Sequence, residues 1–198
     1  MAKRRKTRRR KKGFLAYLIV LLLLVLSYNV FNLRERFFPV RVPSGEKSVR
    51  VREKVVRVKD GDTVVISSGL GGKDYTCRLY GIDSPETAKG KTPGQSYGDD
   101  ATKALQHLVL GKEVEVTLTG GKTYNREVCI LRLNDVDINL KMIELGYAWA
   151  YKQYLKPPYM ETYMDAQRQA RVEHAGLWHD PNPEPPWDFR HLLKHRAK

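Results

Sequence analysis

One apolar segment constrains this chain more than any other feature of its sequence. Residues 13–31 read GFLAYLIVLLLLVLSYNVF and contain no charged side chain. As a helix, this segment would be about 28 Å long, close to the roughly 30 Å hydrocarbon core of a bilayer. Tyr17 and Tyr28 would then lie near the two membrane interfaces. The sequence therefore predicts one N-terminal transmembrane helix.

The charges on either side of this segment predict its orientation. Nine lysines and arginines fall within residues 1–12, whereas Arg34 and Arg36 follow the segment closely. Because strongly basic flanks stay in the cytoplasm, we expect the N-terminus inside and the remainder of the chain outside. A cleaved signal peptide is the alternative, but its apolar core is usually shorter and ends in a small-x-small site, for which SYNVFNLRE offers no clear match.

Length and composition limit the classes of protein to which this chain can belong. Its 198 residues fit one folded domain plus appendages, and 41% hydrophobic with 29% charged residues excludes wholesale disorder. The net charge of +14 comes mostly from residues 1–12, which we interpret as a solvated cytoplasmic tail, with direct binding of RNA or DNA as the alternative. Two cysteines are too few for a disulfide-rich scaffold, and no CxxC or HExxH spacing offers a zinc site. A metal ion, if bound, must be held by oxygen ligands.

The pattern after the apolar segment changes twice. Residues 32–48 are polar and interrupted by Pro39, Pro43 and Gly45, which predicts a flexible tether. Alternating hydrophobic residues then predict five short strands joined by tight turns, which is typical of a small barrel or sandwich. The expected strands cover residues 49–58, 63–66, 74–80, 113–119 and 127–133.

Three helical segments accompany these strands. Their signals are an apolar stripe of Ala101, Ala104, Leu105 and Leu108 ending at Gly111, an N-cap at Asn139 for a short helix ending at Gly146, and a longer helix from Met160 to Ala175 stopped by Gly176. Near the C-terminus, Pro185, Pro186 and Trp187 predict a strap over the barrel, and residues 191–198 predict a basic tail.

Three carboxylates in two motifs are the candidate centre of the chemistry. Asp62 lies in VKDGDT, where a turn enters a strand, and Asp83 and Glu86 lie in CRLYGIDSPE, where Pro85 restricts the loop. Hard cations such as Ca²⁺ take oxygen ligands from carboxylates, backbone carbonyls and water. Two aspartates from different loops would make an open, partly hydrated site. The alternative is that DGD only forms a turn, since Asp-Gly is a common hairpin signal.

Two arginines on predicted strands favour a phosphate site. Arg78 alternates with Cys77 and Leu79, and Arg126 opens the last strand. Guanidinium groups bind phosphate in a bidentate manner and stabilise the extra charge of a phosphoryl transition state. Surface ion pairing is the alternative for either arginine alone.

These motifs together resemble the staphylococcal nuclease family. The resemblance covers residues 49–190 and rests on VKDGDTVVI, CRLYGIDSPET, SYGDDATKAL, the YNR step, INLKMIELGYAWAY and GLWHDPNPEPPW. It implies a mainly β fold with helices, namely a five-stranded OB-type barrel with three helices. It also implies calcium-dependent hydrolysis of phosphodiesters in DNA and RNA.

The resemblance further implies a role for individual residues. Asp62, Asp83 and the Ser84 carbonyl resemble the calcium ligands, and Glu86 resembles the residue that orients or deprotonates the attacking water. Arg78 and Arg126 resemble the pair that binds the scissile phosphate, and Tyr124 resembles a tyrosine that holds a terminal phosphate.

The hairpin before Arg126 departs from the family pattern. Asp-x-Tyr-Gly-Arg is usual there, whereas this chain has Lys122-Thr123-Tyr124-Asn125-Arg126. Asn125 tolerates a positive φ, so the turn can survive, and Lys122 could strengthen phosphate binding. Tyr151 and Tyr154 are further candidates for contacts with bases or phosphate, with core packing as the alternative for Tyr151.

The two cysteines share strand faces with apolar neighbours. We expect Cys77 and Cys129 to be buried as small hydrophobic side chains, on the face opposite the candidate site. A disulfide is the alternative, if their strands are neighbours and the domain is outside the cytoplasm.

Two hypotheses of function follow. The first is a membrane-anchored, calcium-dependent nuclease of low sequence specificity, a monomer without an obligate protein partner. The second is a membrane-anchored, non-catalytic nucleic-acid-binding module on an OB-type barrel. Glu86 favours the first, because a carboxylate beside the phosphate-binding arginines would weaken the affinity of a pure binder.

Overall fold

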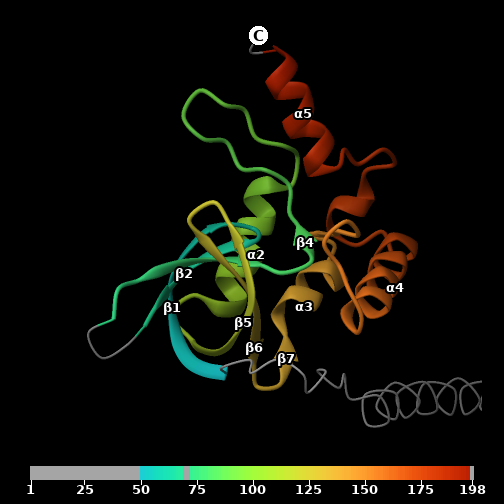
Figure 1. Cartoon of the computed structure of the whole chain (residues 1–198). Helices are drawn as coiled ribbons and strands as arrows, with labels where there is room; N and C mark the ends of the chain where they lie inside the picture. The colour runs from blue at the N-terminus through green and yellow to red at the C-terminus, as the bar shows by residue number, and fades with distance from the viewer. Residues whose placement is uncertain (1–49, 69–71, 197–198) are drawn as a thin grey trace, which may run out of the picture. The chain divides into compact units, whose positions relative to one another are not determined.

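Five strands, whose hydrophobic side chains alternate with more polar ones, pair to form a closed barrel. The computed structural model describes residues 50–68 and 72–196 (Figure 1). The barrel strands are β1 (Arg50–Asp60), β2 (Thr63–Ser67), β3 (Tyr75–Leu79), β5 (Glu113–Thr123) and β6 (Arg126–Leu133). β1 pairs with β2 and β5, β2 with β3, and β5 with β6, all antiparallel. The parallel pairing of β3 with β6 closes the ring, which confirms the predicted five-stranded OB-type barrel.

Strand β1 serves both sides of the barrel because it bends. Its first residues, 50–54, pair with β5, whereas residues 54–60 pair with β2. The register shifts between Val55 and Arg57 and again between Val58 and Asp60. Such bulges bend a strand and increase its twist, so one long strand can turn from one neighbour to the next. Val55, Val64, Cys77 and their neighbours then point into a dry core.

In the described part of the chain, three short strands lie outside the barrel ring, two of them in a separate sheet. β4 (Ile82–Asp83) pairs with β8 (Trp149–Ala150), so that Asp83 lies opposite Trp149. β7 (Val136–Asp137) continues β6 and leads directly into a helix. The β4–β8 pair therefore ties the loop that carries Asp83 to the C-terminal half of the domain.

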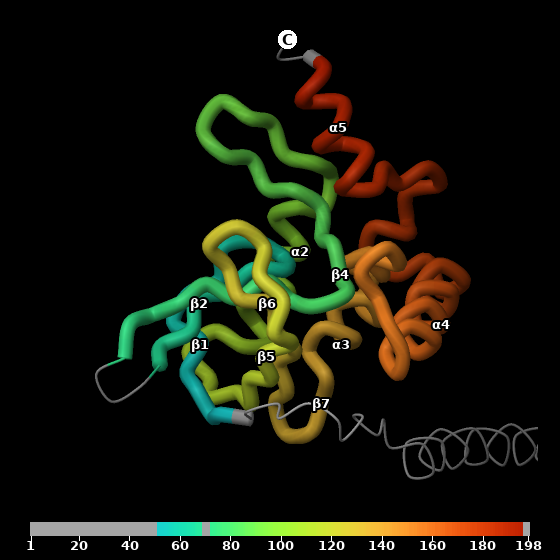
Figure 2. Tube along the Cα trace, viewed as in Figure 1, coloured from blue at the N-terminus to red at the C-terminus, as the bar shows by residue number. Residues whose placement is uncertain are grey.

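Four α-helices are present in the described residues, where three were predicted. They are α2 (Gly98–Val109), α3 (Ile138–Glu144), α4 (Tyr159–Val172) and α5 (Pro186–Arg196), and a 3₁₀ turn, η1 (Gly176–His179), follows α4. The chain can be followed from α4 through η1 into α5 in Figure 2. Helix α5 was not predicted, because residues 185–187 were interpreted as a strap and residues 191–198 as a basic tail. Pro186 suits the first position of a helix, because its fixed φ is helical and its missing N–H is not needed there.

The cap of α3 also differs from its prediction. Asp137, not Asn139, is the N-cap, and its carboxylate accepts a hydrogen bond from the Leu140 N–H at 3.0 Å. Asn139 is instead fully buried. Its side chain accepts from the Leu131 N–H at 3.1 Å and donates to the carbonyls of Tyr80 and Cys129, both at 3.1 Å. Asn139 therefore joins α3 to β6 and to the chain that leaves β3.

Replacing Asn139 with Ala should lower the free energy of unfolding by about 3 kcal/mol or more, since each buried backbone group left without a partner costs about 1–3 kcal/mol. Urea unfolding followed by circular dichroism measures this change. Asn182→Ala is the control, because Asn182 is exposed and its replacement should alter stability by less than about 0.5 kcal/mol. Equal midpoints for the two variants would contradict the role given to Asn139.

The two cysteines meet across the parallel pair of β3 and β6. Both are buried, as predicted, but they form a disulfide rather than free thiols, with their Cα atoms 6.0 Å apart. The sequence could not decide this, because it did not show which strands are neighbours. The bond closes a separation of 52 residues, which corresponds to about 4 kcal/mol of stabilisation in the chain-entropy account.

The predicted transmembrane segment, residues 13–31, lies outside the described residues. So do the basic N-terminal residues 1–12 and the predicted tether, residues 32–48, together with residue 49. Among residues 50–68 and 72–196, no helix is both long enough and apolar enough to cross a bilayer.

Candidate active site

The turn between β1 and β2 packs too closely for any residue but glycine at its centre. A Cβ on Gly61 would lie 2.7 Å from the Cβ of Ala101 and 2.8 Å from the Cβ of Ser84. The backbone of the DGD turn thus packs closely against α2, which carries Ala101, and against the loop after β4, which carries Ser84. The turn therefore has a packing role, and it also carries Asp62 toward Asp83.

Asp62 is buried and fixed by several donors. One carboxylate oxygen, Oδ2, accepts hydrogen bonds from the Ser84 N–H at 3.0 Å and from the Ser84 hydroxyl at 3.1 Å. The other oxygen, Oδ1, accepts from the Thr63 hydroxyl at 2.9 Å. The side chain of Asp62 is therefore held in one orientation at the start of β2.

Arg78 joins the two buried aspartates. Its Nη1 contacts Asp62 Oδ2, and its Nη2 donates to Asp83 Oδ1 at 2.7 Å and to the Ile82 carbonyl at 3.2 Å. As predicted from the alternation in β3, Cys77 and Leu79 are buried on the opposite face. Burial lowers the pKa of Arg78, while the Asp83 carboxylate opposes this shift. The guanidinium stays charged and partly balances the two carboxylates.

Glu86 lies in the loop between β4 and α2. Its N–H donates to the Gln95 side chain at 3.0 Å, and its carbonyl accepts from the Gln95 N–H at 2.8 Å. Gly98 packs directly on this backbone, where a Cβ would lie 2.3 Å from the Glu86 carbonyl oxygen. The main chain at Glu86 is thus fixed, and the carboxylate extends from it with 27% of the side chain exposed.

Arg190, which no sequence motif indicated, completes this cluster from α5. Its Nη1 donates to Glu86 Oε1 at 2.7 Å and to Asp83 Oδ1 at 3.1 Å, and its Nη2 donates to Asp83 Oδ2 at 2.8 Å. Burial alone would lower the pKa of Arg190, but Asp83 and Glu86 raise it above its usual value. One sequence signal could have predicted this helix, namely Pro186 as its first residue. A helix that starts there places Trp187 and Arg190 on the same face.

The hairpin of β5 and β6 brings Arg126 to the same region. Arg126 Nη1 donates to the Thr63 hydroxyl at 3.4 Å, and its Nε donates to the Thr123 carbonyl at 3.5 Å. Both bonds are long, so the guanidinium retains donors for an anion. Its charge also acts on Arg78 by lowering the pKa of that side chain.

The tip of this hairpin differs from its predicted conformation. The positive φ, 56°, falls on Tyr124 and not on Asn125. Tyr124 is 90% exposed, and Lys122 pairs with Glu127 at 2.9 Å across the strands. The hairpin tip, the loop between β4 and α2, and α5 extend from the same end of the barrel (Figure 1).

Two further candidates, Tyr151 and Tyr154, lie beside α5. Tyr151 stacks on Trp187, with ring centroids 5.1 Å apart and planes 8° apart, and Tyr154 packs edge-on against Tyr151. Tyr151 is only partly buried, so it is not a core residue, and Tyr154 is 56% exposed. Burial, followed by the charge of Asp83, raises the pKa of Tyr151.

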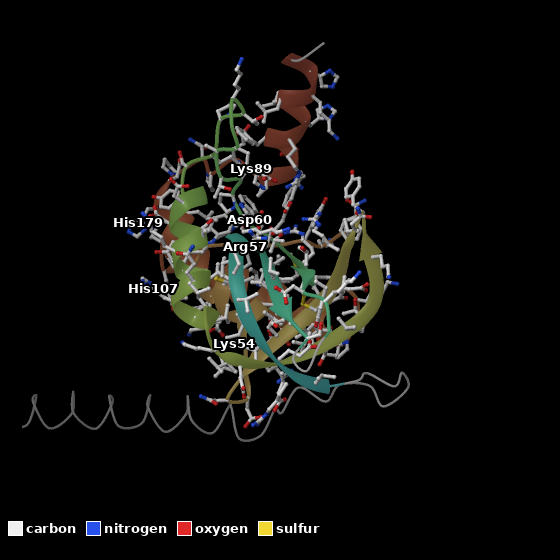
Figure 3. All side chains as sticks on the ribbon, turned by 90° about the vertical axis from the view of Figure 1, so that its left-hand side faces the viewer. Lys54, Arg57, Asp60, Lys89, His107 and His179 are labelled. Atoms are coloured by element: carbon white, nitrogen blue, oxygen red, sulfur yellow. A yellow bond between two sulfur atoms is a disulfide. The ribbon has the colours of Figure 1, made fainter. Side chains whose placement is uncertain are left out.

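Asp60, the last residue of β1, is a further acidic group of this turn. Its Oδ2 accepts from the ammonium group of Lys89 at 3.1 Å, so that the loop between β4 and α2 is also tied to β1 (Figure 3). Asp60 is the first aspartate of DGD, and no site role was predicted for it from the sequence.

Comparison with known proteins identifies the domain that carries this cluster. Residues 76–180 match the family model described as "Staphylococcal nuclease homologue". The chain belongs to the staphylococcal nuclease family. It is 36% identical over 141 residues to an "Uncharacterized endonuclease" of Haemophilus influenzae, an alignment that covers 71% of this chain and 74% of the relative. It is 33% identical over 152 residues to the "Micrococcal nuclease" of Shigella flexneri, covering 72% of this chain and 82% of the relative.

This staphylococcal nuclease domain has a donor set that suits a hard cation. Asp62 and Asp83 are 5% and 0% exposed, and both contact the same guanidinium, so their carboxylates face one region. Across the part of the chain that the structure describes, no group of three or more His, Cys, Asp and Glu side chains forms a metal cage. Two carboxylates without nitrogen or sulfur donors suit a hard cation better than a metal that requires nitrogen or sulfur.

Proposed function

We propose that this protein is a nuclease that hydrolyses phosphodiester bonds of DNA and/or RNA with low sequence specificity, using Ca²⁺. One observation carries the proposal: Arg78 joins Asp62 to Asp83, and Arg190 joins Asp83 to Glu86, so that the three carboxylates form one connected cluster. Arg126 lies beside this cluster, where it contacts Thr63. A phosphodiester is an anion that repels nucleophiles, and such a cluster offers positive charge together with a carboxylate base. The nuclease names of the relatives in Haemophilus and Shigella support this assignment.

The metal would be held by the carboxylates of Asp62 and Asp83 and by the Ser84 carbonyl. A bound Ca²⁺ supplies charge that offsets the phosphate and orients water. Ser84 supports this role indirectly, since its N–H and hydroxyl fix the Asp62 carboxylate.

The protein's own residues perform the remaining steps. Arg126, with two long hydrogen bonds, can bind a phosphate oxygen, and Arg78 adds positive charge at the buried side. Glu86 can take a proton from an attacking water molecule. A new bond then forms from the water oxygen to phosphorus, and the bond from phosphorus to the leaving sugar oxygen breaks. That oxygen keeps the electron pair and takes up a proton from solvent water, which gives a hydroxyl on one fragment and a phosphate on the other. We propose further contacts with the flanking nucleotides, which do not read their sequence, through Tyr124, Lys122, Tyr151 and Tyr154.

Cleavage of labelled duplex DNA and of RNA by the purified chain tests the proposed function. Shortened products support a nuclease. A gel shift without any cleavage across a series of divalent metals would favour the non-catalytic binding module instead.

We also propose that the domain acts outside the cytoplasm, anchored by residues 13–31. The nine basic residues before this segment support the orientation, since each can add about 1 kcal/mol of attraction to anionic headgroups. The disulfide between Cys77 and Cys129 supports an oxidising compartment. A tether of residues 32–48 would give a reach on the order of 20–25 Å.

Protease treatment of intact cells or spheroplasts tests this topology on the full chain with a C-terminal tag. We expect loss of the tag while a cytoplasmic marker protein stays intact. Protection of the tag until the membrane is broken would reverse the topology and would place the substrate in the cytoplasm.

A further inference from the structure

Helix α5 is docked on the domain by its first turn. Trp187 stacks on Tyr151 and packs edge-on against Trp149, with ring centroids 5.5 Å apart. Trp149 is the neighbour of Asp83 across the β4–β8 pair. Residues three apart lie on the same face of a helix, so the docking of Trp187 directs Arg190 toward Asp83.

Arg190 connects two carboxylates with different proposed roles. It donates to both oxygens of Asp83, the candidate metal ligand, and to Glu86, the candidate base. Asp83 has a second partner in Arg78. For the Glu86 carboxylate, Arg190 is the only hydrogen-bonding or ion-pair partner among the described residues.

The loop that carries Glu86 is tied to the segment before α5 at a second point. Gln95 accepts a hydrogen bond from the Glu86 N–H and donates to the Glu184 carbonyl at 3.0 Å. These bonds fix the backbone of Glu86 but leave its side-chain torsions free. The direction of the carboxylate therefore depends on Arg190.

From these contacts we propose that Arg190 is a positioning residue of the active site, which holds the Glu86 carboxylate in a fixed direction relative to Asp83. This inference rests on the nuclease function proposed above. Helix α5 would then complete the active site from outside residues 76–180, the part that matches the family model.

At Glu86, the geometry favours positioning over obstruction. Arg190 bonds only Oε1 of Glu86, and Oε2 has no hydrogen-bond donor in the described part of the chain. Because 27% of the Glu86 side chain is exposed, water can reach this oxygen. One carboxylate oxygen is thus anchored while the other remains available to accept a proton.

The test uses the full chain with Arg190 replaced by Gln, Lys or Ala. We expect Arg190→Gln to lower kcat about 10²-fold, as for a catalytic group that is misplaced by about 1 Å, with little change in KM. Arg190→Lys should restore part of the loss, since an ammonium group can pair with one carboxylate. Added guanidinium should raise the kcat of Arg190→Ala. Lys194→Gln, an exposed position on the same helix, is the control and should behave like the wild type.

A double-mutant cycle separates positioning from a general effect. If Arg190 acts through Glu86, Arg190→Gln should reduce kcat little further in a chain that already carries Glu86→Gln. Fully additive losses would overturn the proposal. So would a wild-type kcat in Arg190→Gln, or an increase in its activity, which would mean that α5 blocks the site.

Hydrogen exchange provides a readout that does not depend on cleavage. In Arg190→Gln, the amides of α5 should exchange faster, because the helix loses its ion pairs with Asp83 and Glu86, while those of β5 and β6 should not change. If the wild-type chain cleaves nothing but this change appears, the nuclease function fails and the structural link between α5 and the two carboxylates stands. Unchanged exchange in α5 would overturn that link.

Discussion

Replacing Glu86 with Gln should lower kcat about 10²- to 10⁴-fold, the range expected when a general base is lost. Gln has nearly the same shape and can still accept a hydrogen bond from Arg190, so the fold should be retained. The affinity for nucleic acid should stay the same or increase, because the variant removes a negative charge near the phosphate. Single-turnover cleavage and a gel shift on the same DNA measure the two effects separately.

The control for this variant is Glu161→Gln, which changes an exposed glutamate on α4. It should leave both kcat and affinity unchanged. If Glu86→Gln cleaves at the wild-type rate, Glu86 is not the base. If it loses affinity together with kcat, Glu86 contributes to binding rather than to proton transfer.

The second large effect concerns the metal ligands. Asp62→Asn and Asp83→Asn should each reduce cleavage to the level seen in excess chelator, because each removes one of only two candidate carboxylate ligands. Titration calorimetry should give a wild-type Kd for Ca²⁺ on the order of 10⁻⁴–10⁻³ M, typical of an open extracellular site. Binding heat should disappear in both variants.

Asp165→Asn, at an exposed position on α4, is the matched control and should keep the wild-type affinity for Ca²⁺. Circular dichroism distinguishes loss of metal from loss of fold. This check matters for Asp83→Asn, since Arg78 and Arg190 would lose a buried partner. Wild-type binding and cleavage in both variants would show that the carboxylates have another role.

Local sequence patterns predicted the barrel because its strands bury one face. Cys77 and Leu79 of β3, and Val114 and Val116 of β5, alternate with more exposed residues as such strands require. The ring closure between β3 and β6 was expected only from the family resemblance. The disulfide depends on that pairing, so the sequence favoured free thiols.

In the candidate site too, local motifs were predicted from the sequence, whereas a contact between distant residues was not. The motifs around Asp62, Arg78, Asp83 and Glu86 are short, and the structure brings all four residues together. Arg190 is separated from Asp83 by 107 residues, and its partners depend on how Trp187 docks. No periodicity in the C-terminal segment could indicate that contact, so residues 191–198 were interpreted as a tail.

Two smaller predictions were wrong, one for the N-cap of α3 and one for the turn between β5 and β6. Asn139 and Asp137 both suit an N-cap, but only Asn can donate to buried carbonyls while it accepts from a backbone N–H. Asn139 therefore took the buried position and Asp137 the cap. In the hairpin, the positive φ was expected at Asn125 because Asn tolerates it well, yet in the two-residue turn between Thr123 and Arg126 it falls on Tyr124.

The proposed cleavage of phosphodiesters by this cluster with the help of Ca²⁺ can be tested directly. The measurement is digestion of supercoiled plasmid and of RNA by the purified full chain, with Ca²⁺ or with excess chelator. We expect nicked and shortened products with Ca²⁺, intact substrate with chelator, and restored cleavage when Ca²⁺ is added back. Equal cleavage in excess chelator, or intact substrate at every Ca²⁺ concentration, would contradict the proposal.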